Sequence, residues 1–70
     1  SKIGILNLQG VKYNTNLKYL KFHYSFNQPL NLDSNVNLTH LIFNGLFNQP
    51  LNLDSNVNMA HLIFGDSFNQ

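Results

Sequence analysis

The segment FNQPLNLDSNVNLTHLIFNGL, residues 26–46, is followed at once by a near-copy of itself, FNQPLNLDSNVNMAHLIFGDS, residues 47–67. Sixteen of the twenty-one aligned residues are identical, and residues 68–70 begin the pattern again with Phe-Asn-Gln. A fixed period of this length is typical of architectures in which one short unit stacks on copies of itself. The repeat therefore predicts a solenoid, and arrays of this kind usually function in binding.

A short apolar pattern recurs once in each copy. Its spacing, apolar-x-x-Leu-x-Phe, occurs at Leu17, Leu20 and Phe22, at Leu38, Leu41 and Phe43, and at Met59, Leu62 and Phe64. Alternation in the last three residues places Leu and Phe on one face and the intervening residue on the other. The pattern predicts a short parallel strand in each unit. The expected fold class is leucine-rich-repeat-like and mainly β, with irregular or short extended return segments.

Proline and short polar residues mark the return segments. Pro29 and Pro50 lack an amide donor and restrict the preceding residue, so they indicate where the chain leaves the strand ladder. The Asp-Ser-Asn runs at 33–35 and 54–56 are expected to turn it back, through side chains bonded to nearby backbone amides. Each return segment is too short for a standard helix.

The period divides the chain into units. We expect residues 1–70 to form one array, itself part of a longer one, with a divergent or shortened unit at 1–16. Strand-first units follow at 17–37, 38–58 and 59–70, the last incomplete, and are called repeats 1, 2 and 3. In residues 1–16 the best match to the strand pattern is Ile3, Leu6 and Leu8, which lies 14 residues before the next instead of 21.

Stacking predicts columns of identical side chains. Two phenylalanine columns are expected inside the array, one of Phe22, Phe43 and Phe64 and one of Phe26, Phe47 and Phe68. A ladder of Asn27, Asn48 and Asn69 is expected beside them. A side-chain amide both donates and accepts, so these asparagines can satisfy backbone groups of the turning chain and are interpreted as structural.

Composition excludes several classes of partner. Four basic against three acidic residues leave the chain almost neutral, so we expect no nucleic acid and no anionic membrane surface as partner. There is no cysteine and no apolar run long enough to span a bilayer, so a cytoplasmic location is expected.

Catalytic and metal sites are not indicated. Asp33, Asp54 and the serines beside them belong to the turn chemistry, and no nucleophile, base and orienting group recur together. His40 and His61 should stack in adjacent strands, but zinc needs three or four protein ligands and the third position in their column is Tyr19. We predict no enzyme activity, no metal and no cofactor.

Residues pointing outward from the strands should line the concave face of a curved array. Their mixture of aromatic, apolar and basic side chains suits a protein or peptide partner. The alternative is that β-branched residues there only stabilise the sheet, and both interpretations stay open. The predicted binding residues are Lys18, Tyr19, Lys21, His23, Thr39, His40, Ile42, Asn44, His61 and Ile63.

The run Phe-Asn-Gln-Pro-Leu, preceded by Leu-Thr-His-Leu-Ile-Phe-Asn-Gly, resembles the FNIP repeat of social amoebae and giant viruses of amoebae. The resemblance covers residues 17–70 well and residues 1–16 poorly; His23-Tyr24-Ser25 replaces the usual glycine turn, and Leu30 and Leu51 replace isoleucine. It implies a leucine-rich-repeat-like fold and, where an F-box precedes the array, substrate recognition for a ubiquitin ligase. It also implies host-cell cytoplasm if the source is viral.

A structural role is the competing hypothesis. Matching columns of Phe and Asn at both ends would let units add end to end, and exposed edge strands promote such pairing. The array would then self-associate into a polymer instead of binding a different protein.

Overall fold

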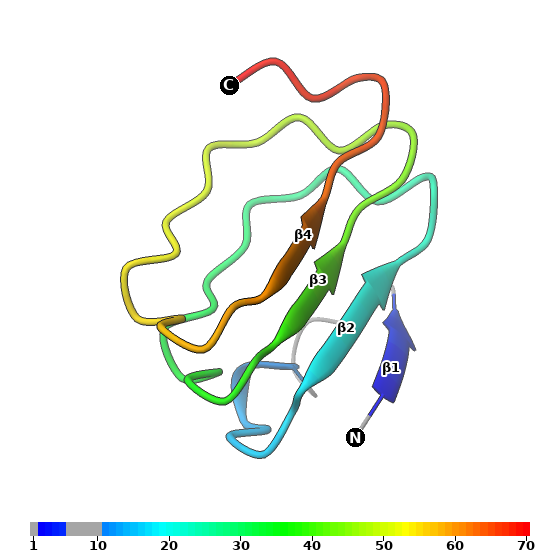
Figure 1. Ribbon diagram of the computed structural model, residues 1–70. Coiled ribbons are helices and arrows are strands. Elements are labelled where there is room, and N and C mark those ends of the chain that lie inside the picture. Colours follow the sequence, from blue (N-terminus) through cyan, green and yellow to red (C-terminus); the bar gives the residue numbers. More distant parts are fainter. Residues whose placement is uncertain (1, 6–10) are drawn as a thin grey trace.

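The chain folds around a sheet of four parallel strands (Figure 1). The computed structural model describes residues 2–5 and 11–70. The order in the sheet follows the order in the sequence, so each strand pairs with the one before it. The prediction of a mainly β chain with short parallel strands is confirmed. The strands are β1 (Lys2–Ile5), β2 (Tyr19–Phe22), β3 (His40–Ile42) and β4 (His61–Ile63).

The register between β2, β3 and β4 places every residue beside its own copy. Tyr19 pairs with His40 and His40 with His61, and the next two positions of each strand follow in step. This alignment follows from the 21-residue period, because any other register would move the apolar set out of line with its copies. Side chains of the same kind therefore lie next to one another along the sheet.

The predicted position of the first strand is wrong. Ile3 pairs with Leu20, an offset of 17 residues, whereas the sequence pattern aligned Leu6 with Leu20. The segment Ile3-x-Ile5 has the same alternation as Leu6-x-Leu8, so strand periodicity could not distinguish the two. Leu6 and Leu8 lie outside the described residues.

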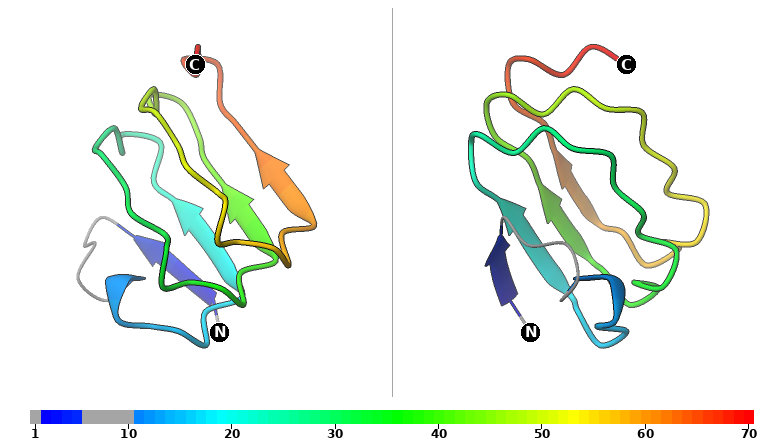
Figure 2. Two further views of the ribbon diagram at one scale, coloured as in Figure 1. Left: turned by 90° about the vertical axis from the view of Figure 1, so that its left-hand side faces the viewer. Right: turned by 180° about the vertical axis from the view of Figure 1, so that it is seen from behind.

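The return segments form a second layer along one side of the sheet (Figure 2). After each of β2 and β3 the chain turns and runs back in irregular or extended form. The connection before β2 includes a helical turn at Val11 and Lys12. Within residues 2–5 and 11–70, no helix is long and apolar enough to cross a membrane.

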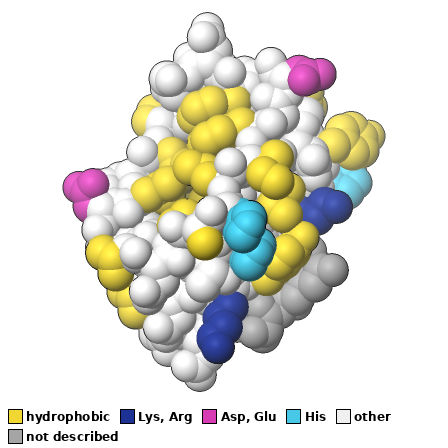
Figure 3. All heavy atoms as spheres, viewed as in Figure 1, with side chains coloured by type: hydrophobic (Ala, Val, Ile, Leu, Met, Phe, Trp, Pro, Cys, Tyr) yellow, Lys and Arg dark blue, Asp and Glu magenta, His cyan; other side chains and the backbone are white. Residues whose placement is uncertain are grey.

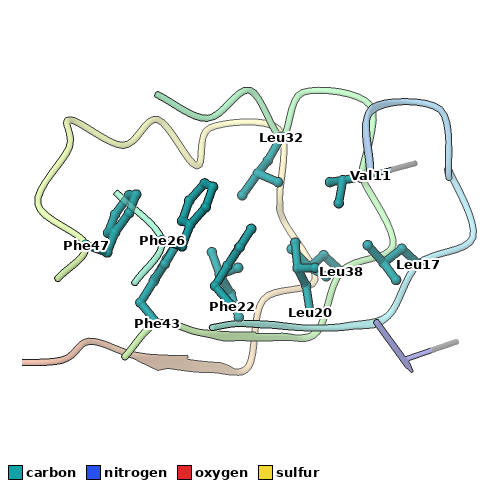
Figure 4. Close-up of a cluster of buried hydrophobic side chains, with 10 residues drawn as sticks. Val11, Leu17, Leu20, Phe22, Phe26, Leu32, Leu38, Phe43 and Phe47 are labelled. Carbon is teal, nitrogen blue, oxygen red and sulfur yellow. The ribbon is translucent and has the colours of Figure 1, made fainter. Parts of the chain in front are cut away.

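The core lies between the sheet and the return segments (Figure 4). Leu20, Phe22 and Leu41 project into it from the strands, and Leu32 meets them from the return segment of repeat 1. Burial of this apolar surface is the main favourable contribution to folding. Among residues 11–70, the fully buried hydrophobic residues are Val11, Leu17, Leu20, Phe22, Phe26, Leu32, Leu38, Leu41, Phe43 and Phe47.

The two phenylalanine columns are present, and they also pack against each other. Phe22, Phe43 and Phe64 stack with ring centroids 5.1 and 5.7 Å apart. Phe26, Phe47 and Phe68 stack at 5.8 and 6.0 Å. Within a repeat the two rings are closer, at 4.2, 3.9 and 3.8 Å. Offset stacking of this kind contributes about 0.5–1.5 kcal/mol per pair beyond area burial.

The two phenylalanine columns are less buried in repeat 3 than the sequence predicted. Phe22, Phe26, Phe43 and Phe47 are buried, but Phe64 and Phe68 are only partly so. Repeat 3 has a neighbouring unit on one side within the described residues, which explains the difference. Within the described residues, the two columns are therefore least covered in repeat 3.

The predicted asparagine ladder is confirmed, although it faces solvent. The Oδ1 atom of Asn27 accepts a hydrogen bond from the backbone amide of Asn48 at 2.9 Å. Asn48 Oδ1 accepts in the same way from the amide of Asn69 at 2.9 Å. All three residues are exposed, so water can replace each bond and its contribution is expected to be below about 1 kcal/mol.

A second ladder, buried in the molecule, was not predicted. Asn35 Nδ2 donates to the carbonyls of Val11 at 2.8 Å and Asn14 at 3.0 Å. Asn56 Nδ2 repeats this with the carbonyls of Leu32 and Asn35, at 3.0 and 2.9 Å. The Oδ1 atoms of Asn35 and Asn56 accept no hydrogen bond within the described part of the chain. The two donors of each amide therefore hold successive return segments together.

The prediction that side chains of the Asp-Ser-Asn runs accept from the turning backbone is also wrong. The side chain that accepts from the turning backbone belongs to Asn31, whose Oδ1 receives the amide of Asp33 at 2.9 Å. Asn52 does the same for Asp54 at 2.8 Å. Asparagine two residues earlier makes this turn as readily as aspartate. Asn35 and Asn56 are thus free to bond between repeats.

The corner after β3 and the corner after β4 approach each other closely. Gly45 adopts a left-handed backbone, with φ of 52°. A Cβ atom added to Gly65 would meet the backbone nitrogen of Gly45 and would lie 2.6 Å from the carbonyl carbon of Asn44. Only glycine fits at position 65, which explains why repeat 3 differs there from repeat 2.

The phenylalanine columns make a first prediction. Phe43 is fully buried between Phe22 and Phe64, so Phe43→Ala should destabilise the fold by about 3–5 kcal/mol. That is a large share of the roughly 4–10 kcal/mol expected for a chain of this length. Thermal and urea denaturation measure the loss, with exposed Leu46→Ala as the control. Equal melting temperatures for the two variants would contradict this account of the core.

The buried ladder makes a second prediction. Asn35→Asp removes the amide that donates to Val11 and Asn14, and it places a carboxyl group against two carbonyl oxygens. The two carbonyls keep their backbone donors, the amides of Asn14 and Leu17, so the cost comes from two lost hydrogen bonds, about 0.5–1.5 kcal/mol each, and from a buried carboxylate, whose charged form burial disfavours. The variant should be strongly destabilised in urea at pH 7. Burial should raise the pKa of the new carboxyl in the folded state, so the deficit should shrink as pH falls.

Asn37→Asp is the matched control. Asn37 Nδ2 also donates to the preceding repeat, to the Thr15 carbonyl at 2.9 Å, but this residue is exposed. Water can replace its hydrogen bond, so the loss should be below about 1 kcal/mol. Similar losses for the two variants would show that burial does not determine the role of the ladder.

Candidate functional site

The outward side of the strands carries two columns of side chains, called here the strand face. In each strand the central leucine points inward, so its two neighbours point outward. The alternation Tyr-Leu-Lys in β2 and His-Leu-Ile in β3 and β4 builds the columns directly from the sequence. The first column contains Tyr19, His40 and His61, and the second contains Lys21, Ile42 and Ile63.

The first column is a continuous stack of rings. The Tyr19 and His40 ring centroids are 5.4 Å apart and their planes differ by 28°. The His40 and His61 centroids are 4.3 Å apart with planes within 6°. The Nδ1 atom of His40 also lies 2.9 Å from the Thr39 hydroxyl. The column therefore presents flat aromatic surface with polar nitrogen atoms beside it.

The second column is apolar at one end and basic at the other. Ile42 is partly exposed, Ile63 is 51% exposed, and Lys21 is exposed. Hydrophobic side chains lie beside the histidines over the sheet (Figure 3). An apolar surface with polar groups at its border is typical of protein contact sites.

Thr39 and Asn44 were also predicted to bind a partner, and their side chains contribute to the fold as well. The Thr39 hydroxyl donates to the Lys18 carbonyl at 3.0 Å, and Asn44 Nδ2 donates to the Phe22 carbonyl at 3.2 Å. Both bonds join repeat 2 to repeat 1. The two side chains are therefore less available to a partner than the sequence suggested.

His23 lies past the end of β2, where it makes a local turn. Its Nδ1 accepts from the backbone amide of Ser25 at 3.2 Å and lies 2.8 Å from the Ser25 hydroxyl. The neighbouring Tyr24 is 63% exposed, and its ring centroid is 4.4 Å from that of His23. Tyr24 was not among the predicted residues. The sequence offered one signal for Tyr24, because this aromatic residue occupies the position that Gly45 has in repeat 2.

The described residues contain no group of three or more His, Cys, Asp or Glu that could hold a metal ion. The absence of catalysis and of a cofactor remains a prediction. What the strand face can do chemically is make contacts: ring stacking, apolar burial and hydrogen bonds from imidazole.

Comparison of the sequence with family models, and of the chain with curated proteins and with solved structures, found no match. The interpretation of the site therefore depends on its own geometry.

Proposed function

We propose that this chain is a segment of a leucine-rich-repeat-like solenoid of the FNIP-repeat type and that it binds a protein partner without catalysis. The strand face is the binding surface. The observation that supports this best is the alignment of Tyr19, His40 and His61 beside Ile42 and Ile63 on one sheet. Parallel strands lie about 4.8 Å apart, which fixes the spacing of these side chains before any partner arrives.

The residues favour an extended peptide or a loop as ligand. The stacked rings and the isoleucines offer apolar contact, and imidazole nitrogens can bond to a peptide backbone. Lys18 and Lys21 add positive charge at one side, which favours an acidic residue in the partner. A surface held by a sheet loses little conformational entropy on binding.

A cellular role follows from the resemblance to FNIP repeats. In a longer protein that carried an F-box, this array would recognise substrates for a cytoplasmic ubiquitin ligase. The strand face would then select the substrate, and the transfer chemistry would belong to other subunits.

Peptide selection tests the proposal. Random peptides displayed on phage are selected on the 70-residue chain, and the affinity of the enriched peptide is measured by fluorescence anisotropy. The variant Ile42→Thr with Ile63→Thr removes apolar surface from the strand face but keeps β-branched residues, so the strands should persist. We expect the affinity to fall about tenfold or more, which corresponds to about 1.4 kcal/mol.

The matched control is Val36→Thr with Val57→Thr. These valines are also exposed and undergo a similar change, but they lie in the return segments. Binding by this variant should stay within about twofold of the parent, well under the 1.4 kcal/mol of a tenfold change. If both variants weaken binding equally, or if selection yields no peptide, the strand face is not the binding site.

A further inference from the structure

The corner that follows β3 contains the dipeptide Asn44-Gly45, which occurs nowhere else in the sequence. The equivalent residues are His23-Tyr24 after β2 and Gly65-Asp66 after β4. These three corners lie side by side at one edge of the sheet (Figure 1). Asn44 and Gly45 are both partly exposed, so water reaches the corner. Here alone in the sequence, an asparagine side chain precedes a residue without a Cβ atom.

The backbone nitrogen of Gly45 is not held by a hydrogen bond. Within residues 2–5 and 11–70 it donates to no acceptor, whereas the next amide, that of Leu46, donates to the Tyr24 carbonyl at 2.9 Å. The residue of repeat 3 that lies against this nitrogen is Gly65, where an added Cβ atom would clash with it. Gly45 has no Cβ atom of its own to hinder approach. The nitrogen is therefore accessible as a nucleophile.

The carbon that this nitrogen can attack is the side-chain carbonyl carbon, Cγ, of Asn44. Asn44 Nδ2 donates to the Phe22 carbonyl at 3.2 Å, and this hydrogen bond is only partly buried. Water can replace it, so the side chain can turn toward its own backbone. Cγ and the Gly45 nitrogen belong to adjacent residues, and an intramolecular attack gains from the proximity of its reacting atoms.

We propose that Asn44 and Gly45 form a self-modification site, at which the side chain of Asn44 is deamidated. The Gly45 nitrogen attacks Asn44 Cγ, so that an N–Cγ bond forms and the Cγ–Nδ2 bond breaks. The departing NH₂ group takes up the proton of the Gly45 amide and leaves as ammonia. Water then adds to one of the two carbonyls of the resulting succinimide ring. An aspartyl or an isoaspartyl residue remains at position 44, and the reaction involves no partner at the strand face.

Both products weaken the contact between repeats 1 and 2. A carboxylate at position 44 cannot donate to the Phe22 carbonyl, and its charge lowers the formal net charge from +1 to zero. The isoaspartyl product also carries the backbone through the side chain, which lengthens the corner by one methylene group. That corner is fixed on two sides, because the Leu46 amide donates to the Tyr24 carbonyl and the Gly45 carbonyl accepts from the Ser67 amide at 3.1 Å. The isoaspartyl form should therefore be the less stable of the two.

Incubation of the 70-residue chain at neutral and mildly alkaline pH tests the site. Mass spectrometry of proteolytic fragments reports the exchange of NH₂ for OH, and labelling by isoaspartyl methyltransferase reports the isoaspartyl product. We expect Asn44 to react at least about tenfold faster than any other asparagine, which corresponds to a barrier lower by about 1.4 kcal/mol. The rate should rise with pH, because the attacking nitrogen must lose its proton.

The matched control is Asn44→Gln, which keeps the amide group but places it one methylene further from the Gly45 nitrogen. Residue 44 of this variant should react at least about tenfold more slowly than in the parent.

Urea distinguishes reaction of the folded corner from reaction after unfolding. Below the unfolding transition the rate should stay within about twofold, because the folded chain itself reacts. A reaction through the unfolded state would accelerate with the unfolded fraction, which rises steeply with urea.

Thermal denaturation measures the effect on the junction between the repeats. Asn44→Asp reproduces the aspartyl product, and ion exchange of the incubated chain supplies the isoaspartyl form. We expect the melting temperature to fall from the parent to Asn44→Asp and to fall again in the isoaspartyl form. Three results would overturn the proposal: faster reaction at another asparagine, a rate that follows the unfolded fraction in urea, or an isoaspartyl chain that melts with the parent.

Discussion

The fold depends on a single constraint, which is that each residue in β3 and β4 lies beside its own copy one repeat earlier. Leu41 pairs with Leu20 on one side and with Leu62 on the other. The register sets the spacing of every column at once, so phenylalanine rings stack on rings and amides meet carbonyls. A change at one position is therefore felt by the repeats before and after it. This explains how a small chain with little charge can hold ten fully buried hydrophobic residues within residues 11–70.

The asparagine side chains of this chain both donate and accept, because each amide carries an NH₂ group and a carbonyl oxygen. The amide nitrogen supplies two donors, and Asn35 and Asn56 use both to join return segments that have no strand ladder between them. The carbonyl oxygen accepts backbone amides in the exposed ladder that Asn27 and Asn48 form. Asn31 and Asn52 use the same oxygen to close a turn within their own repeat. One residue type thus serves three geometries, and this accounts for its abundance without a ligand.

The sequence was sufficient for the features that depend on period and less so for those that depend on local geometry. The parallel strands, both phenylalanine columns and the exposed ladder follow from identical residues at a fixed spacing. The position of β1 could not be predicted, because Ile3-x-Ile5 and Leu6-x-Leu8 alternate in the same way. The buried role of Asn35 was missed because an asparagine in a polar run fits a turn equally well. For the strand face, alternation identified the outward residues, but only the structure showed that Thr39 and Asn44 bond between repeats.

The contact between the corners at Gly45 and Gly65 has a consequence for how such a gene can change. Residues 26–46 and 47–67 agree at sixteen of twenty-one positions, which makes their coding sequences good substrates for unequal crossover or gene conversion. A conversion that wrote repeat 2 over repeat 3 would place asparagine at position 65, with its Cβ against the Gly45 backbone. The two copies are therefore alike in sequence, but one cannot replace the other without a steric clash. Selection against that clash would preserve the small differences between them while the rest of the pattern stays uniform.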